Sequence, residues 1–88
     1  MKKKESLRSR NVTIQGSRTS LRMEQEVWDA LEEICRREAK SLHQICTMLE
    51  ERRNVSNRTS AIRAFILSYF RIAATDAGHM IAGHGAAA

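Results

Sequence analysis

Two arginines and a serine alternate along a short segment near the amino terminus. Arg18, Ser20 and Arg22 are each separated by one residue, and Leu21 and Met23 fall between or beside them. In an extended strand this period of two places the polar residues on one face and the apolar residues on the other. Guanidinium groups on an open face can bind guanine edges bidentately and can contact phosphates. The segment therefore predicts a short strand that offers its arginines to nucleic acid.

Simpler roles for the same residues remain open. Arg18 and Arg22 could be edge-strand charges that prevent aggregation. Ser20 could be a small spacer. Thr19 alternates onto the inner face, so we expect it to lie inside the fold rather than to read DNA.

The positive charge of the chain is concentrated at the same end. The formal net charge is +5. Residues 1–23 hold seven Lys or Arg against one acidic residue, a net charge of +6, whereas residues 24–88 hold eight basic against nine acidic residues, a net charge of −1. A basic segment on a nearly neutral body is typical of an arm that binds a polyanion, although it could also be only a solvated tail. We expect phosphate contacts from its basic side chains: Lys2, Lys3, Lys4, Arg8 and Arg10.

The length and composition set limits on the fold. A chain of 88 residues forms one domain, and a core this small usually needs a disulfide, a metal or a partner subunit. Two cysteines cannot supply a disulfide framework, so we expect oligomerisation. No apolar run is long enough for a membrane span, and the basic start lacks the apolar stretch of a signal peptide. We therefore expect a cytoplasmic protein in which Cys35 and Cys46 are reduced.

Helical periodicity begins directly after the strand. Between Glu24 and about Ala39 the apolar residues Val27, Leu31 and Ile34 recur on one face, as in an amphipathic helix. Trp28 lies beside this stripe and is expected in the core or a dimer interface rather than in a ligand site.

Two further helices are predicted. Ser41 and Gln44 fit a capping box that starts a helix ending near Arg53. After a loop with Ser56 or Asn57 as the next cap, a third helix is predicted over 58–74. Its apolar face is expected to pack on the body of the protein and holds Ile62, Phe65, Ile66, Tyr69 and Phe70.

The chain thus divides into four segments. From Thr75 onward Gly, Ala and His follow no period, which predicts a frayed tail. The predicted segments are a basic arm that could hold a short strand (1–16), a strand-helix-helix core (17–53), a C-terminal helix (54–75) and a disordered tail (76–88).

A lone strand needs a hydrogen-bonding partner, because unpaired buried amides are costly. The segment around Val12–Ile14 could supply one, and the sequence leaves that question open. The more economical solution pairs the same strand from two chains antiparallel about a two-fold axis. Arg18, Ser20 and Arg22 of both chains would then stand on one two-stranded ribbon, a size that fits the B-DNA major groove.

The sequence from Arg18 to Leu31, followed by Arg-Glu-Ala-Lys-Ser-Leu-His-Gln-Ile, resembles the ribbon-helix-helix DNA-binding proteins of the Arc and MetJ type. The longer pattern over about residues 11–71 is similar to a small bacterial subgroup with an extra C-terminal helix. The resemblance implies a mostly α fold with one short β-strand and an additional C-terminal helix, assembled as an intertwined homodimer around a two-stranded antiparallel ribbon.

The resemblance also implies roles for individual residues. Base contacts fall on Arg18, Ser20 and Arg22. Phosphate contacts fall at the start of the second helix, on Lys40, Ser41 and Leu42, through free amides and the helix dipole. Two positions depart from the family pattern. Lys40 stands where the family usually has glycine, which implies a left-handed lysine, and Glu24 stands where a neutral residue is common and would repel DNA mildly.

Metal and catalytic sites are not predicted. Cys35 and Cys46 fall on apolar stripes and are expected to act as small hydrophobic residues, and with His43 they would still lack a fourth zinc ligand. His79 and His84 fall in the tail. There is no glycine-rich phosphate loop and no Ser–His or Cys–His pair. We expect no cofactor and no enzymatic activity.

Three hypotheses follow for function. The first is a homodimeric, sequence-specific double-stranded DNA-binding repressor that could assemble further on DNA. The second is an antitoxin whose residues 58–88 bind a toxin. The third is a protein-interaction module that has kept the fold and lost DNA binding, for which Glu24 is the hint.

Overall fold

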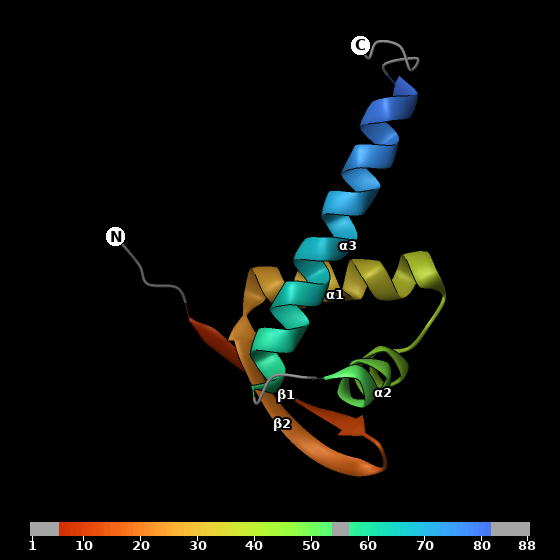
Figure 1. Cartoon of the computed structure of the whole chain (residues 1–88). Coiled ribbons are helices and arrows are strands. Elements are labelled where there is room, and N and C mark those ends of the chain that lie inside the picture. Colours follow the sequence, from red (N-terminus) through yellow and green to blue (C-terminus); the bar gives the residue numbers. More distant parts are fainter. Residues whose placement is uncertain (1–5, 54–56, 82–88) are drawn as a thin grey trace.

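The computed structural model describes residues 6–53 and 57–81 of the 88-residue chain. A two-stranded antiparallel sheet is followed by three helices, so the fold is mostly helical (Figure 1). The elements are β1 (Leu7–Ile14), β2 (Ser17–Glu24), α1 (Gln25–Glu38), α2 (Leu42–Arg52) and α3 (Arg58–Ile81).

The two strands form a hairpin within one chain. Ile14 lies opposite Ser17, and the register continues to Leu7 opposite Glu24. The two turn residues have positive φ, 51° at Gln15 and 83° at Gly16, as a type I′ hairpin turn requires. The segment around Val12–Ile14, which the sequence left open, therefore supplies the partner of β2. The described chain has two strands where we predicted one.

β1 begins at Leu7, well before the segment around Val12–Ile14 that the sequence offered as a strand, so residues 7–10 of the basic arm are also strand. Contacts with α1 explain the difference. The indole Nε1–H of Trp28 donates to the Arg8 carbonyl at 2.9 Å. The guanidinium of Arg10 pairs with Glu32 and lies 4.7 Å from the Trp28 ring centroid. These contacts fix the first half of β1, although its side chains stay exposed.

The core lies between one face of the hairpin and the three helices. Val12, Ile14, Leu21 and Met23 point from the strands into this core and are at most 4% exposed. Trp28 is fully buried, which confirms the core position expected from the sequence. The helices close the cluster with Leu31 of α1, Ile45 and Cys46 of α2, and Ile62 of α3.

The connection between α1 and α2 corrects one expectation. The left-handed residue is Ala39, with φ 56° and ψ 44°, and not Lys40. Helix α1 therefore ends one residue earlier than a left-handed Lys40 would imply, and the N–H of Lys40 donates to the Cys35 carbonyl. The capping box of α2 is confirmed: the Ser41 hydroxyl accepts from the Gln44 N–H, and the Gln44 amide oxygen accepts from the Ser41 N–H.

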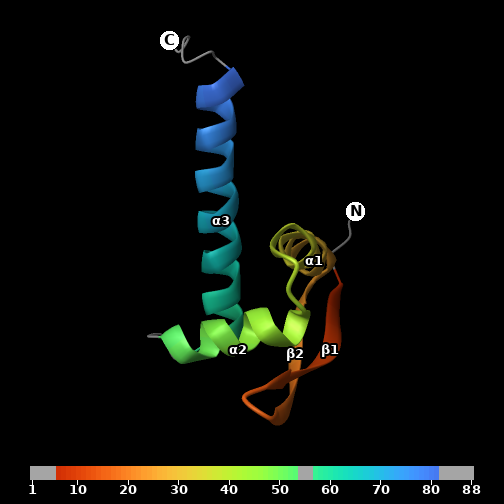
Figure 2. The ribbon, with the colours of Figure 1, turned by 90° about the vertical axis from the view of Figure 1, so that its right-hand side faces the viewer.

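Helix α3 is longer than the sequence predicts, since it continues to Ile81 instead of ending at Ala74. No proline interrupts it, and alanine, the best helix former, recurs along it. Asn57 caps its start by accepting the Ser60 N–H at 3.1 Å. Its first half packs on α1, α2 and β2 through Ile62 and its neighbours. Its second half extends beyond the rest of the molecule (Figures 1 and 2).

Candidate nucleic-acid interface

The three predicted base-contact residues lie on one exposed face of β2. Arg18, Ser20 and Arg22 are exposed, whereas Leu21 and Met23, which alternate with them, are buried in the core. Within the part of the chain that the structure describes, neither Arg18 nor Arg22 has an ion pair or a side-chain hydrogen bond. Their guanidinium groups therefore face solvent with free donors.

The hairpin register adds three residues that sequence reasoning missed. Ser9 lies opposite Arg22, Asn11 opposite Ser20, and Thr13 opposite Arg18. Directly opposite residues of an antiparallel pair share a face of the sheet. The six exposed polar side chains of this surface, called the outer face below, are Ser9, Asn11, Thr13, Arg18, Ser20 and Arg22.

A usable signal for the added row was present in the sequence. Val12 and Ile14 alternate with Asn11 and Thr13, and Gly16 marks a turn before the arginine strand. Extending that alternation back through Ser9 would have predicted the second row of the outer face.

The two edges of the hairpin differ. The pair Ile14–Ser17 closes the two-residue turn and is hydrogen bonded, so N–H and C=O groups of Arg18, Ser20 and Arg22 point away from β1. Among the described residues no segment pairs with that edge of β2. The outer edge of β1 is partly covered by α2, because the Thr13 N–H donates to His43 Nδ1 at 2.9 Å and the Gln15 N–H donates to Thr47 Oγ1 at 3.2 Å.

The predicted phosphate contacts are distributed unevenly. Arg8 and Arg10 lie opposite Met23 and Leu21, so their side chains belong to the other face of the hairpin, and Arg10 is engaged by Glu32 and Trp28. The structure does not bring these two residues to the outer face. Lys2, Lys3 and Lys4 lie outside the described residues.

The start of α2 lies beside β1 (Figure 2). Lys40 and Ser41 are exposed there, while Leu42 is half-buried against the core. The Ser41 hydroxyl oxygen caps the helix, because it already accepts a hydrogen bond from the Gln44 N–H. An approaching phosphate would meet the Lys40 ammonium and the remaining N–H groups of the first turn.

The negative charge of Glu24, at the end of β2, is paired by α3. A nitrogen of the Arg63 guanidinium donates to the Glu24 carboxylate at 2.8 Å. This hydrogen bond lowers the pKa of the Glu24 carboxyl group. The repulsion of DNA expected from Glu24 is therefore reduced by a cation that lies 39 residues away in the sequence.

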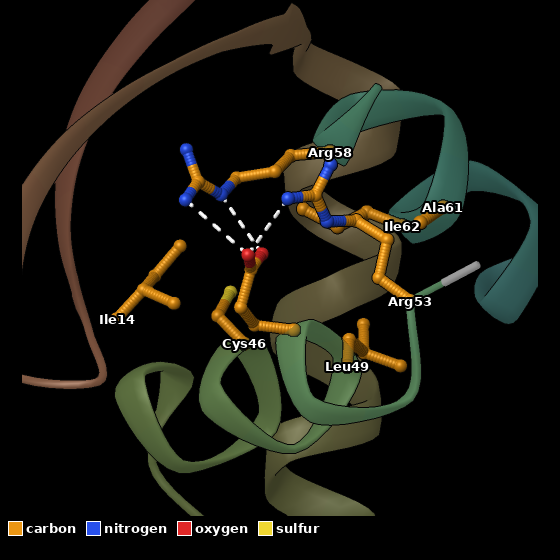
Figure 3. Close-up of a pocket in the computed structure, with 8 residues that line it drawn as sticks. Ile14, Cys46, Leu49, Arg53, Arg58, Ala61 and Ile62 are labelled. Carbon is orange, nitrogen blue, oxygen red and sulfur yellow. Dashed lines mark hydrogen bonds and ion pairs between the residues drawn. The ribbon is translucent and has the colours of Figure 1, made fainter. Parts of the chain in front are cut away.

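A second group of arginines lies between α2 and α3 (Figure 3). Arg58 donates to both oxygens of Glu50, at 2.8 and 3.3 Å, and Arg53 donates to the same carboxylate at 2.8 Å. The bonds from Arg58 and then Arg53 hold the pKa of Glu50 below its ordinary value, and Glu50 raises the pKa of Arg58. These groups enclose a cavity of about 10 Å³, which is room for one water. We call this cluster the α2–α3 corner; it is lined by Ile14, Cys46, Leu49, Glu50, Arg53, Arg58, Ala61 and Ile62.

The cysteines take part in packing. Cys46 is 2% exposed in the core, and burial raises the pKa of its thiol to about 11. Cys35 is half-buried beside the same cluster, and its thiol pKa is also raised by burial. Among the side chains that the structure describes, those of residues 6–53 and 57–75, no three from His, Cys, Asp or Glu gather as metal ligands would.

Comparison with known proteins agrees with this arrangement of strand, turn and helices. A family model described as a ribbon-helix-helix domain matches residues 7–70. The chain belongs to the ribbon-helix-helix family. Ribbon-helix-helix proteins are usually DNA-binding regulators that dimerise, and they are typically not enzymes.

One solved structure similar to this ribbon-helix-helix chain is an uncharacterized protein from Bordetella pertussis Tohama I. The two share 31% sequence identity with a TM-score of 0.67, and the match covers 82% of this chain. It covers 62% of the Bordetella protein, so this chain spans less than two thirds of that relative. A search of curated proteins gives no match. In the described part of the chain, no helix has the length and apolar character that crossing a membrane requires.

Proposed function

We propose that the chain is a homodimeric, sequence-specific double-stranded DNA-binding protein of the bacterial cytoplasm that represses transcription by occupying its operator. The observation that carries the proposal is the outer face. Arg18 and Arg22 stand there exposed and without intrachain partners, on a rigid strand whose opposite face is locked in the core. Neighbouring same-face residues along a strand are about 7 Å apart, so Arg18 and Arg22, with Ser20 between them, are about 13 Å apart, which is close to four base-pair steps. Each arginine could therefore address a separate guanine in the major groove.

The open edge of β2 supports the homodimer. Its backbone groups at Arg18, Ser20 and Arg22 need partners, and an identical strand placed antiparallel about a two-fold axis supplies them. Because β1 already occupies the other edge, the dimer would hold a four-stranded sheet with two β2 strands at its centre. The predicted ribbon of two β2 strands is retained in this arrangement and gains a flanking strand on each side.

Phosphate contacts would come from Lys40, from amides of the first turn of α2 at Ser41 and Leu42, and from the basic arm. The ion pair between Glu24 and Arg63 favours this proposal over a module that has lost DNA binding, since it weakens the repulsion expected from Glu24 at the end of β2. The antitoxin alternative receives less support, because the first half of α3 packs on its own chain rather than standing free for a toxin.

Selection of bound sites from a random duplex pool tests the proposal. We expect a palindromic motif with guanines in each half-site, together with an affinity that falls steeply as salt rises. Arg22→Ala should remove the preference for one guanine and weaken binding by about 5- to 150-fold. Failure to enrich any motif, or an Arg22→Ala variant that binds as the parent does, would show the proposal to be wrong.

A further inference from the structure

The two strands of the hairpin offer different chemistry on the same outer face. β2 contributes two guanidinium groups, whereas β1 contributes, beyond the apolar Leu7 at its start, three short neutral side chains, those of Ser9, Asn11 and Thr13. All three are exposed, and none of these side chains makes a hydrogen bond to another described residue. Their free donors are therefore available to an external acceptor.

Asn11 is the most informative of the three. Asparagine is depleted in strands, yet it lies well inside β1, opposite Ser20. The position of β1 does not depend on it, because Val12 and Ile14 are buried and Arg10 is held by Glu32 and Trp28. The side chain of Asn11 thus contributes little to folding, which leaves binding as a reason for an amide at this site.

The dimensions of the proposed dimer decide which part of DNA the β1 row meets. With neighbouring strands about 4.8 Å apart, each β1 lies about 7 Å from the two-fold axis and each β2 about 2.4 Å from it. The major groove is about 12 Å wide, so its walls lie about 6 Å from the centre. The β2 rows therefore lie over the base edges, while the β1 rows lie over the sugar-phosphate backbones.

We propose that the two strands divide the work: β2 reads bases, and the β1 row of Ser9, Asn11 and Thr13 binds backbone phosphates along each wall of the groove. Short amide and hydroxyl side chains are common phosphate donors that carry no sequence information. This inference rests on the proposed function and its dimer.

His43 continues the same track at the end of β1. Its Nδ1 accepts the Thr13 N–H at 2.9 Å, so the neutral ring carries its proton on Nε2. The side chain is exposed, and Nε2–H is a further donor directly beside the β1 row. The phosphate track thus runs from Ser9 through Asn11 and Thr13 to His43 at the start of α2.

The test uses the full chain with Asn11→Asp, which keeps the shape of the side chain and replaces donors by a negative charge. Ser68→Asp on the exposed surface of α3 is the matched control for added charge. Binding to the selected operator and to random duplex DNA is measured at two salt concentrations, together with the thermal midpoint. We expect Asn11→Asp to weaken both affinities by the same factor, about tenfold or more, with an unchanged motif. Asn11→Thr, which keeps a donor and suits a strand better, should bind nearly as the parent does.

Each other outcome is decisive. If Asn11→Asp changes the preferred base at one position, Asn11 reads bases and the division of work is wrong. If it leaves affinity unchanged, or if Ser68→Asp weakens binding equally, the phosphate track is wrong while the proposed function stands. If the parent chain selects no site at all, the proposed function itself fails.

Discussion

Arginines occupy two regions of this molecule in two electrostatic states. On the outer face, Arg18 and Arg22 point into solvent without carboxylate partners among the described residues. At the α2–α3 corner, Arg53 and Arg58 close around Glu50, whose side chain is only 13% exposed. Arginine therefore holds α2 and α3 together where Glu50 supplies a carboxylate. On the outer face, where no described carboxylate pairs with it, its guanidinium group stays available to an external ligand. A count of positive charges would not have separated these two roles.

The largest expected effect is a loss of stability when Ile62, in the apolar part of the α2–α3 corner, is truncated. Ile62→Ala removes a side chain that is 3% exposed and joins α3 to the core. We expect a loss of about 2–5 kcal/mol in the free energy of unfolding, measured by urea denaturation. Leu67→Ala on the same helix, at a position 61% exposed, should change stability very little. Equal losses for the two variants would mean that α3 does not pack as described.

The next effect separates the two groups of arginines. Combined Arg18→Ala and Arg22→Ala substitution should weaken operator binding by at least about 30-fold, because each protomer loses two base contacts. The thermal midpoint should stay near that of the parent, since neither side chain makes a hydrogen bond or ion pair with another described residue. Arg58→Ala should do the reverse, lowering the midpoint and leaving affinity nearly unchanged. A stability loss in the double variant would contradict the comparison.

A smaller effect is expected at the ion pair between Glu24 of β2 and Arg63 of α3. Arg63→Ala frees the charge of Glu24 at the end of β2, and binding should weaken by up to about 5-fold through repulsion of DNA. Adding Glu24→Gln to that variant should restore affinity, since the repulsive charge is then gone. Gel shifts at low salt measure both variants. If the double variant binds no better than Arg63→Ala alone, Arg63 acts through folding and not through charge.

The smallest expected effect is a pH dependence of the stability that Glu50 contributes at the α2–α3 corner. Because Arg58 and Arg53 lower the pKa of Glu50, its carboxylate stabilises the fold above the ordinary value of 4.5, and this contribution is lost as the pH falls through the lowered pKa. Thermal midpoints of the parent and of Glu50→Gln should differ near neutral pH and converge as the pH falls through the lowered pKa of Glu50. A constant difference across that range would mean that the ionisation of Glu50 does not contribute.

Local patterns predicted the parts of the structure that depend on neighbours in the sequence. The alternation around Arg18 and Arg22 placed both on an open face, because the side chains of a strand alternate by geometry alone. The Ser41–Gln44 capping box is likewise a matter of residues three apart. The left-handed position was misassigned to Lys40 instead of Ala39, since where a helix ends depends on its final hydrogen bonds rather than on one residue type.

Long-range contacts were beyond those patterns. The start of β1 at Leu7 depends on Trp28 and Glu32 reaching back to Arg8 and Arg10, so Ser9 was missed, although the alternation around Val12 and Ile14 was a signal for Asn11 and Thr13. Arg8 and Arg10 were assigned to DNA for their charge, although the register turns them to the other face. The extension of α3 to Ile81 was missed because the tail has no apolar period, while its backbone still favours a helix.

The sequence alone determined which side chains of β2 could face DNA, where α2 begins, and that Leu21, Met23 and Trp28 face the interior. Only the tertiary structure decided which arginines have carboxylate partners, that β1 pairs with β2 in the same chain, and that β2 keeps one open edge. The physical reason is the separation in sequence over which each interaction acts. Alternation and capping act over a few residues of backbone, whereas charge pairing and strand register depend on segments that meet only after the hydrophobic core has formed.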